Sequence, residues 1–399
     1  MSFSGRRPDE NEPKRRSVCI LSSSTGPYHM ARYQALAELS KDFRVIRFAP
    51  RRAGYLWRDP AGDEQRDFDI TTLFDKPLEH VRSRKLAAAV NDSLARSGAD
   101  VVVAVGYSNR GMRAAARWAR RNGRTSLMTT DTWAGDKKRL WLKESLKGRW
   151  CRKMYDGMFL SGSRSRDYFV GLGFPSENIQ LGMDVIDDRH FREGAGLARS
   201  RSRELRTRLG LPEDYFICVA RHSPEKNLAR LLDAFRMYRE RDGRWGLVLA
   251  GDGPLRRDLE QKAGRLGLRD VRFTGWLDYE LLPAYYGLAG ALILPSISEP
   301  WGLVVNEAMA CGLPVLVSRK CGCGPELCLP GKNGYAFDPW NVGGIAEVML
   351  RLSSKECGLE AMGRLSRDLV EKYTPRTWAA SLLELVQHSS PKRTRARQP

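Results

Sequence analysis

Short apolar runs alternate with amphipathic stretches along most of this chain. The runs are a few residues long and rich in Val, Ile and Leu, which is typical of buried strands, whereas the stretches between them repeat apolar positions at helical spacing. The pattern predicts strands at 17–22, 43–49, 101–105, 126–129, 156–161, 178–181, 215–219, 245–250, 271–273, 289–294 and 315–317. Strands that alternate with helices in this way indicate a parallel sheet with helices on both faces.

The alternation stops once and then restarts, which indicates two domains. The chain has 399 residues, a length that is high for a single hydrophobic core. A segment rich in Arg, Gly and Ser separates the two series of strands and is the predicted linker. The predicted organisation is a basic disordered leader at 1–16, a first α/β domain at 17–187, a linker at 188–213, a second α/β domain at 214–372, a final helix at 373–388 and a basic disordered tail at 389–399.

The stretch from Pro295 to Ser318, PSISEPWGLVVNEAMACGLPVLVS, carries the clearest candidate chemistry. Its apolar ends predict two strands, and between them a loop carries Glu299 and a helix beginning at about Leu303 carries Glu307. Both carboxylates can therefore point into one cleft. The free N–H groups and the positive dipole end of the helix N-terminus favour an anion beside them.

A pair of cations lies at an equivalent place in the second domain. Arg221 and Lys226 follow the first strand of that domain and precede a helix, where α/β sheets bind phosphates. A guanidinium and an ammonium at this spacing can bind a diphosphate. Gly251 and Gly253 also follow a strand, but Arg256 stands where a dinucleotide fingerprint has its third glycine, so a tight strand-to-helix turn is favoured there.

These motifs together resemble the signature of family 4 retaining glycosyltransferases, whose GT-B fold has two Rossmann-like αβα domains facing across a cleft. The resemblance rests on E-x7-E from Glu299 to Glu307 and on R-x4-K from Arg221 to Lys226, and it is densest between 215 and 339. It implies that Glu307 holds the nucleotide ribose and Glu299 the hydroxyls of the donor sugar. The other donor-binding positions that it implies are Arg221 and Lys226 at the diphosphate, Trp276 at the base, and the backbone of Gly302, Leu303 and Val304. It also implies a last helix that packs back on the first domain.

The first domain would bind the acceptor, and it departs from the common family pattern. Gly26 stands alone where two adjacent glycines are usual, and Asp131 stands where a histidine is usual. His29 and Asp131 both follow predicted strands and are the candidate catalytic groups of this half, with Gly26 as a donor contact. The alternative is that they are ordinary polar groups of loops.

Net charge and cysteine content bear on partners and location. A net charge of +20 and a pI of about 9.8 predict an anionic partner: a nucleotide sugar, nucleic acid or anionic lipid. Arginines recur at helical spacing from 110 to 124, and Leu142, Leu146 and Trp150 share one face of a helix rich in lysine. That helix either binds a membrane surface or covers a core with a solvated face. Specific nucleic-acid binding is not expected, because no recognised motif occurs.

The eight cysteines lie mostly in apolar runs, so reduced thiols in a cytoplasmic protein are expected, with a peripheral place at the inner membrane surface as an option. The leader has no apolar core of a signal peptide, and no run is long enough to cross a bilayer. Cys321, Cys323 and Cys328 lack standard zinc spacing, so a structural role is expected for them. Arg221, Lys226 and the helix N-terminus would stabilise a departing diphosphate, so neither a metal nor another cofactor is expected besides the nucleotide sugar.

The resemblance therefore implies a retaining glycosyltransferase that moves a sugar from a UDP- or GDP-linked donor to a hydroxyl of a glycan, a glycolipid or a small metabolite. Two other classes stay open: another GT-B enzyme, such as an inverting transferase or a phosphorylase, and a nucleic-acid-binding protein. The sugar, the nucleotide, the acceptor and the oligomeric state are not determined by these motifs.

Overall fold

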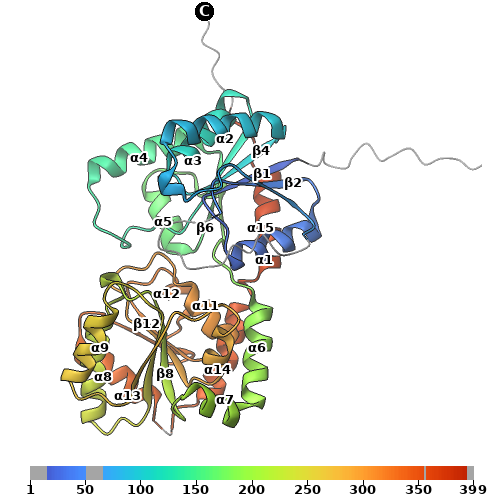
Figure 1. Cartoon of the computed structure of the whole chain (residues 1–399). Helices are drawn as coiled ribbons and strands as arrows, with labels where there is room; N and C mark the ends of the chain where they lie inside the picture. Colours follow the sequence, from blue (N-terminus) through green and yellow to red (C-terminus); the bar gives the residue numbers. More distant parts are fainter. Residues whose placement is uncertain (1–15, 51–65, 355, 393–399) are drawn as a thin grey trace, which may run out of the picture.

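The computed structural model describes residues 16–50, 66–354 and 356–392, which form two α/β domains, one above the other in Figure 1. Most of the predicted leader and tail, 1–15 and 393–399, lies outside the described residues. The described ends are held on the first domain and are not disordered. The Arg16 guanidinium donates to the carbonyls of Val386 and Ser389, and the Lys392 N–H donates to Asp156 at 3.0 Å.

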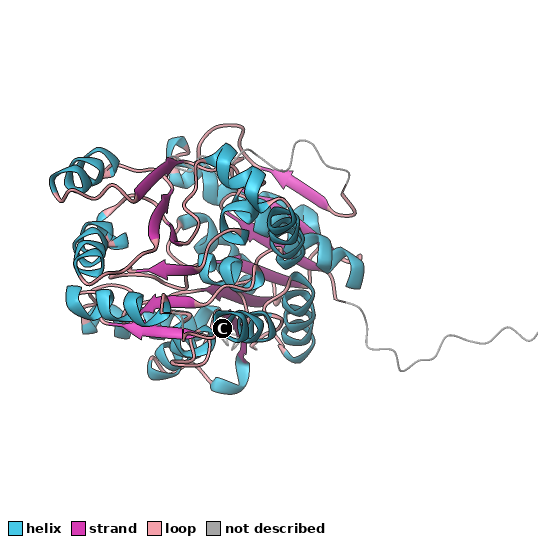
Figure 2. Cartoon of the chain, turned by 90° about the horizontal axis from the view of Figure 1, so that it is seen from below, coloured by secondary structure: helices cyan, strands magenta, loops and turns pink. Residues whose placement is uncertain are grey.

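The first domain is built on a parallel sheet that has seven strands among the described residues, in the order β3-β2-β1-β4-β5-β6-β7. Its central strands are buried along almost their whole length because helices cover both faces (Figure 2). The strands are β1 (Val18–Ser22), β2 (Phe43–Arg47), β3 (Asp69–Thr72), β4 (Val101–Val105), β5 (Thr125–Thr130), β6 (Gly157–Leu160) and β7 (Ile179–Leu181). The helices are α1 (Pro27–Leu39), α2 (Ser83–Ser97), α3 (Arg110–Arg121), α4 (Trp141–Met154) and α5 (Ser163–Gly171).

The second domain repeats this plan with a parallel sheet of six strands, again counted over the described part of the chain, in the order β10-β9-β8-β11-β12-β13. The strands are β8 (Tyr215–Val219), β9 (Gly246–Ala250), β10 (Val271–Gly275), β11 (Ala291–Leu294), β12 (Val315–Ser318) and β13 (Gly334–Phe337). The helices are α8 (Leu228–Glu240), α9 (Arg256–Arg265), α10 (Leu282–Gly287), α11 (Leu303–Ala310), α12 (Gly324–Leu327), α13 (Val342–Leu352) and α14 (Leu359–Val370). The predicted α/β architecture of both halves is therefore confirmed.

The segment predicted as a linker is helical and belongs to the second domain. Residues 188–213 contain α6 (Asp188–Ser200) and α7 (Ser202–Leu209). Phe191, Ala195 and Leu205 on these helices are buried in the core beneath β8 and β11. Their arginines and glycines gave the segment a polar composition, but the buried positions recur at helical spacing and provide an apolar stripe.

The last helix, α15 (Pro375–His388), returns to the first domain and lies beside α1 (Figure 1). Trp378 is 5% exposed and packs its ring against Tyr33 and Phe159, with centroids 6.2 and 6.0 Å apart. Leu382 is fully buried in the same cluster. The end of the chain thus completes the core of the domain with which the chain begins.

Among the described residues, no helix combines the length and apolarity that a bilayer crossing requires.

Truncation of Trp378 should therefore destabilise the first domain. Trp378→Ala removes a large buried ring, a change that usually costs about 3–5 kcal/mol. We expect the unfolding transition in urea to shift to lower denaturant, measured by circular dichroism. Trp340→Ala, at a tryptophan that is 48% exposed on the second domain, serves as the control and should leave the transition in place. Equal shifts in the two variants would contradict this role of α15.

Candidate functional site

A cavity of about 700 Å³ lies between the two domains, at the carboxyl ends of strands from both sheets. Loops that follow parallel strands meet at one edge of a sheet, so polar groups from distant parts of the chain converge there. Nine of the eleven predicted site residues line the cavity: Asp131, Arg221, Lys226, Trp276, Glu299, Gly302, Leu303, Val304 and Glu307.

Lys226 and Glu299 form an ion pair in the second-domain wall of this cavity. Lys226 ends the short helix η3 (Pro224–Lys226) after β8, and Glu299 lies in the loop after β11. The ammonium donates to the Glu299 carboxylate, whose Oε2 also accepts from the Ser296 hydroxyl at 3.1 Å. Burial alone would lower the pKa of Lys226, but the charge of the adjacent Glu299 and the hydrogen bond to it together outweigh burial and raise that pKa above its usual value. The ammonium therefore remains protonated at neutral pH.

Glu307 is almost fully buried, with 2% of its surface exposed, on the second turn of α11. Its two carboxylate oxygens accept hydrogen bonds from Tyr28 of the first domain at 2.8 Å and from Tyr286 of α10 at 2.7 Å. Burial raises the pKa of Glu307 to about 7, although both phenols act to lower it. Both acceptor oxygens therefore already have hydroxyl donors of the kind that a vicinal diol would supply.

The N-terminus of α11 brings backbone close to the same cavity. Gly302 precedes the helix with φ of 106°, and a Cβ at this position would lie 3.1 Å from the Leu294 side chain. Only glycine adopts this backbone without strain. The first turn of an α-helix has N–H groups without intrahelical partners, so Leu303 and Val304 place such groups and the positive dipole end at the cavity.

Arg221 and the neighbouring glycine turn complete the second-domain wall. Arg221 lines the cavity with an exposed side chain, and none of the ion pairs between described residues involves it. Gly251, with φ of 132°, follows β9, and a Cβ there would lie 2.1 Å from the Ala220 carbonyl oxygen. The glycine therefore permits the close approach of two loops, as expected of the tight strand-to-helix turn that the sequence favours here. Trp276 also lines the cavity and is 37% exposed.

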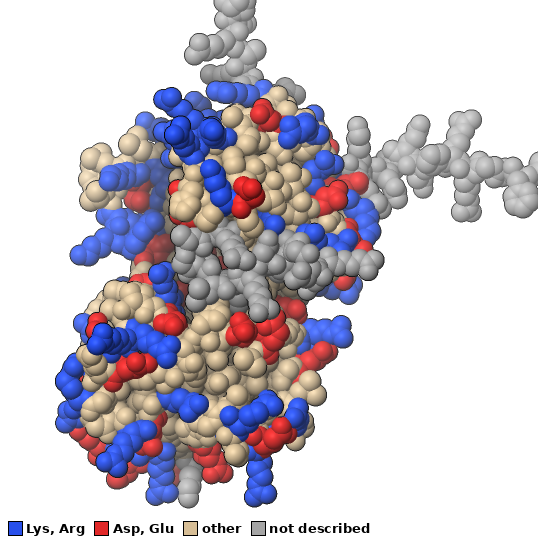
Figure 3. All heavy atoms as spheres, in the orientation of Figure 1, with Lys and Arg blue, Asp and Glu red and all other residues tan. Residues whose placement is uncertain are grey.

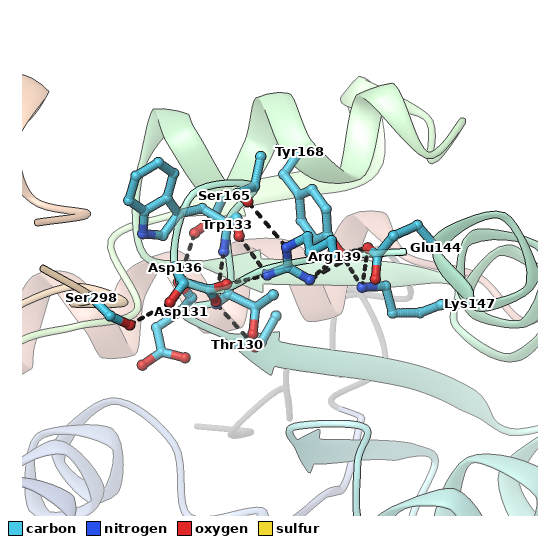
Figure 4. A network of polar contacts seen from close by, with 12 residues as sticks. Thr130, Asp131, Trp133, Asp136, Arg139, Glu144, Lys147, Ser165, Tyr168 and Ser298 are labelled. Atoms are coloured by element: carbon cyan, nitrogen blue, oxygen red, sulfur yellow. Dashed lines mark hydrogen bonds and ion pairs between the residues drawn. The ribbon is translucent and has the colours of Figure 1, made fainter. Parts of the chain in front are cut away.

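Asp131 and Asp184 bring two carboxylates from the first domain. Asp131 follows β5, and Figure 4 shows its carboxylate pointing away from the hydrogen-bond network of the adjoining loop. Asp184 follows β7, accepts from Ser161 at 2.7 Å and lies 3.7 Å from the Arg32 guanidinium. Burial, followed by the charge of Asp184, raises the pKa of Asp131 to about 7. Asp184 was not predicted, although its place just after a parallel strand was an available signal.

His29 and Gly26 are not among the residues that line the cavity, in contrast to their prediction as site residues. Gly26 is the N-cap of α1, and its N–H donates to His29 Nδ1 at 3.3 Å. The His29 ring packs near Tyr33, with centroids 6.2 Å apart. Burial lowers the pKa of His29 to about 3, so the ring is neutral at physiological pH. The structure therefore places both residues at the start of α1, where they cap the helix.

The loop that carries Glu299 is held from both domains. The Glu299 carbonyl accepts from the Trp133 indole at 3.2 Å and from the Gly322 N–H at 3.0 Å. A Cβ at Gly322 would lie 1.7 Å from the Pro300 carbonyl oxygen, so this contact requires glycine. The flanking Cys321 and Cys323 are buried in the second-domain core, where burial raises the pKa of both thiols.

Comparisons with known proteins agree with this geometry. Residues 202–371 match the family model "Glycosyl transferases group 1". A GDP-mannose-dependent alpha-(1-6)-phosphatidylinositol monomannoside mannosyltransferase of Mycolicibacterium smegmatis is 33% identical over 232 residues, which are 56% of this chain and 59% of that protein. A sulfoquinovosyl transferase of Arabidopsis thaliana is 34% identical over 56% of this chain and 42% of its own. The chain thus spans about half the length of the curated relatives that it matches.

Solved structures are similar over nearly the whole chain. The Anabaena protein HepE in complex with UDP and glucose has a TM-score of 0.74 at 17% identity, over 93% of this chain and 99% of that one. Sucrose-phosphate synthase from Thermosynechococcus elongatus has a TM-score of 0.68 at 19% identity, over 94% and 98%. At such identities the likeness shows the fold, and the predicted GT-B arrangement of two Rossmann-like domains is confirmed.

The raised pKa of Asp131 predicts a pH-dependent stability. Between its unfolded pKa near 4 and its folded pKa of about 7, the folded state holds a proton that the unfolded state has lost, so stability falls as pH rises through this window. Asp131→Asn removes this loss, and we expect the variant to be more stable than the parent at pH 8 by about 1–3 kcal/mol, with a smaller difference at pH 5. Urea unfolding at both pH values measures it.

Asp167→Asn, at an exposed carboxylate of α5, is the matched control and should show no such dependence. A difference for Asp131→Asn that is the same at pH 5 and pH 8 would contradict the assignment.

Proposed function

We propose, from the match of residues 202–371 to the glycosyl transferases group 1 model, that the chain transfers a sugar from a UDP- or GDP-linked donor to an acceptor hydroxyl with retention at the anomeric carbon. The observation that supports this most is the convergence of Lys226, Glu299 and the N-terminus of α11 on one cavity. A nucleoside-diphosphate sugar has an anionic diphosphate and several hydroxyls. This wall offers positive charge for the diphosphate and a carboxylate that can accept hydrogen bonds from the hydroxyls.

The donor would lie along the second-domain wall. Arg221, Lys226 and the first N–H groups of α11 would neutralise the diphosphate, which becomes the leaving group. The Glu299 carboxylate, held in place by Lys226 and Ser296, would accept hydrogen bonds from the sugar hydroxyls. Among the relatives, the names and titles mention GDP-mannose and UDP, so both nucleotides stay in the proposal.

Glu307 would hold the ribose diol in place of two phenols. The Tyr28 and Tyr286 hydroxyls occupy its oxygens at 2.8 and 2.7 Å. Ribose hydroxyls that replaced them would leave the carboxylate equally well satisfied, because one pair of donors exchanges for another. Tyr28 belongs to the first domain, so this exchange would also remove a contact between the domains.

The transfer step would use front-face attack. The acceptor oxygen forms the new bond to the anomeric carbon while the bond from that carbon to the diphosphate oxygen breaks, and the acceptor proton passes to the departing phosphate. Positive charge at the leaving group comes from Arg221, Lys226 and the α11 dipole, so we propose that no metal is needed. Asp131, on the first-domain wall, would contact the acceptor. The cytoplasmic location stays a prediction, supported by the eight free cysteines.

Loss of either member of the ion pair should nearly abolish transfer. Lys226→Ala removes charge from the diphosphate site, and Glu299→Ala removes the acceptor of the sugar hydroxyls, so we expect at least a hundredfold fall in kcat/KM, the order of a lost electrostatic contact. Product formation from nucleotide sugars measures this. Lys262→Ala, which breaks the α8–α9 ion pair with Asp233, is the control and should retain activity. Full activity in either site variant would refute the assignment.

Nucleotide binding should be visible without knowledge of the acceptor. Ligand that binds only the folded state raises its unfolding temperature, so UDP or GDP should raise the Tm of the parent protein, and Arg221→Ala should reduce that rise. The rise and the transfer rate should both persist in EDTA. No shift with any nucleoside diphosphate, or loss of transfer in EDTA, would contradict the proposed donor site or its independence of metal.

A further inference from the structure

Large apolar side chains cluster on the solvent-exposed surface in the first half of α4. Leu140, Trp141, Leu142 and Leu146 are 61%, 77%, 59% and 64% exposed. They make up four of the eleven exposed large hydrophobic residues in the described part of the chain, so they form a patch and are not scattered singly. Trp150 does not join them, because its ring packs edge-on against the buried Tyr155 at 5.6 Å. We call these four residues the α4 face.

Cations surround the α4 face without acidic partners. Lys137, Lys138, Lys143 and Arg149 are exposed, and none of them forms an ion pair with another described residue. The acidic residue of this helix, Glu144, instead accepts hydrogen bonds from Lys147 and Tyr168. Figure 3 shows Lys and Arg side chains over the part of the first domain that carries α3 and α4, with an uncharged area at the outer end of α4.

We propose that the α4 face docks the protein on an anionic lipid bilayer, with Trp141 and the leucines in the interface and the lysines at the headgroups. Tryptophan and leucine flanked by cations is the composition of a helix that lies in the plane of a membrane surface. Nucleic acid would be bound by the cations alone and gives no reason for exposed leucines. A second copy of this chain on a two-fold axis would oppose the same unpaired cations.

One loop joins this surface to the cavity (Figure 4). Arg139, next to the α4 face, donates to the Trp133 carbonyl and to the Asp136 carboxylate, and it lies 4.4 Å above the Tyr168 ring. Trp133 in turn donates to the Glu299 carbonyl. A bilayer beneath α4 would thus lie one loop away from Asp131. If the proposed transferase function holds, on which this consequence rests, the acceptor hydroxyl belongs to the headgroup of a lipid.

Vesicle sedimentation tests the docking directly and needs neither donor nor acceptor. The full chain should sediment with vesicles of phosphatidylcholine mixed with phosphatidylglycerol, less with phosphatidylcholine alone, and less at high salt. Trp141→Ser combined with Leu142→Ser should lower the vesicle partition coefficient about tenfold or more. Lys137→Glu combined with Lys138→Glu should abolish the preference for phosphatidylglycerol.

Matched controls lie on the second domain. Leu197→Ser changes a leucine that is 68% exposed, and Arg257→Glu combined with Arg265→Glu changes the same number of charges on α9. Both should sediment like the parent. The α4 variants should keep the Tm of the parent and the same rise in Tm with UDP or GDP. This result would show that they fold and bind nucleotide, so a loss of sedimentation would report on docking and not on the donor site. Docking is overturned if the parent stays in the supernatant, if the α4 variants sediment like the parent, or if they abolish a dimer instead.

Discussion

The ion pair between Lys226 and Glu299 is the contact on which the arrangement of the cleft depends. It joins the loops after β8 and β11, which are neighbouring strands of the second sheet. The Glu299 carbonyl is also the acceptor for the Trp133 indole of the first domain. Glu299 therefore pairs with a cation at the cavity wall through its side chain, and it contacts the opposite domain through its backbone carbonyl. A rotation that moved Trp133 away from Glu299 would therefore break a hydrogen bond at a residue of the cavity wall.

The cleft gathers several carboxylates beside Arg221 and Lys226, although the chain as a whole is strongly basic. The net charge is +20, yet Asp131, Asp184, Glu299 and Glu307 all line one cavity. Burial raises the pKa of both Asp131 and Asp184, and the charge of Asp184 adds to the rise at Asp131, so the fold bears an energetic cost to keep these acids there. Groups retained at such a cost are commonly functional. Protein hydroxyls already donate to three of these acids: Ser161 to Asp184, Ser296 to Glu299, and Tyr28 with Tyr286 to Glu307.

Most of the fold was predictable because most of its strands are short apolar runs, and the second-domain wall of the cavity was predictable because its residues follow such strands within a few positions. β3 was missed because an edge strand with mostly exposed residues, Asp69–Thr72, has no apolar run. The linker was mistaken because α6 and α7 hide a narrow apolar stripe among arginines. Tyr28 could not be found, since its role depends on a contact across 279 positions of sequence that no local pattern encodes.

The return of α15 to the first domain has a consequence for the order in which the chain can fold as it is synthesised. The first domain emerges from the ribosome first, but Trp378 and Leu382, which fill its core beside Tyr33, emerge only after the whole second domain. Until then the face of α1 that they cover is open to solvent. The second domain can complete its core before α15 has been synthesised, whereas the first domain cannot. The amino-terminal half of this protein is therefore the last to finish folding.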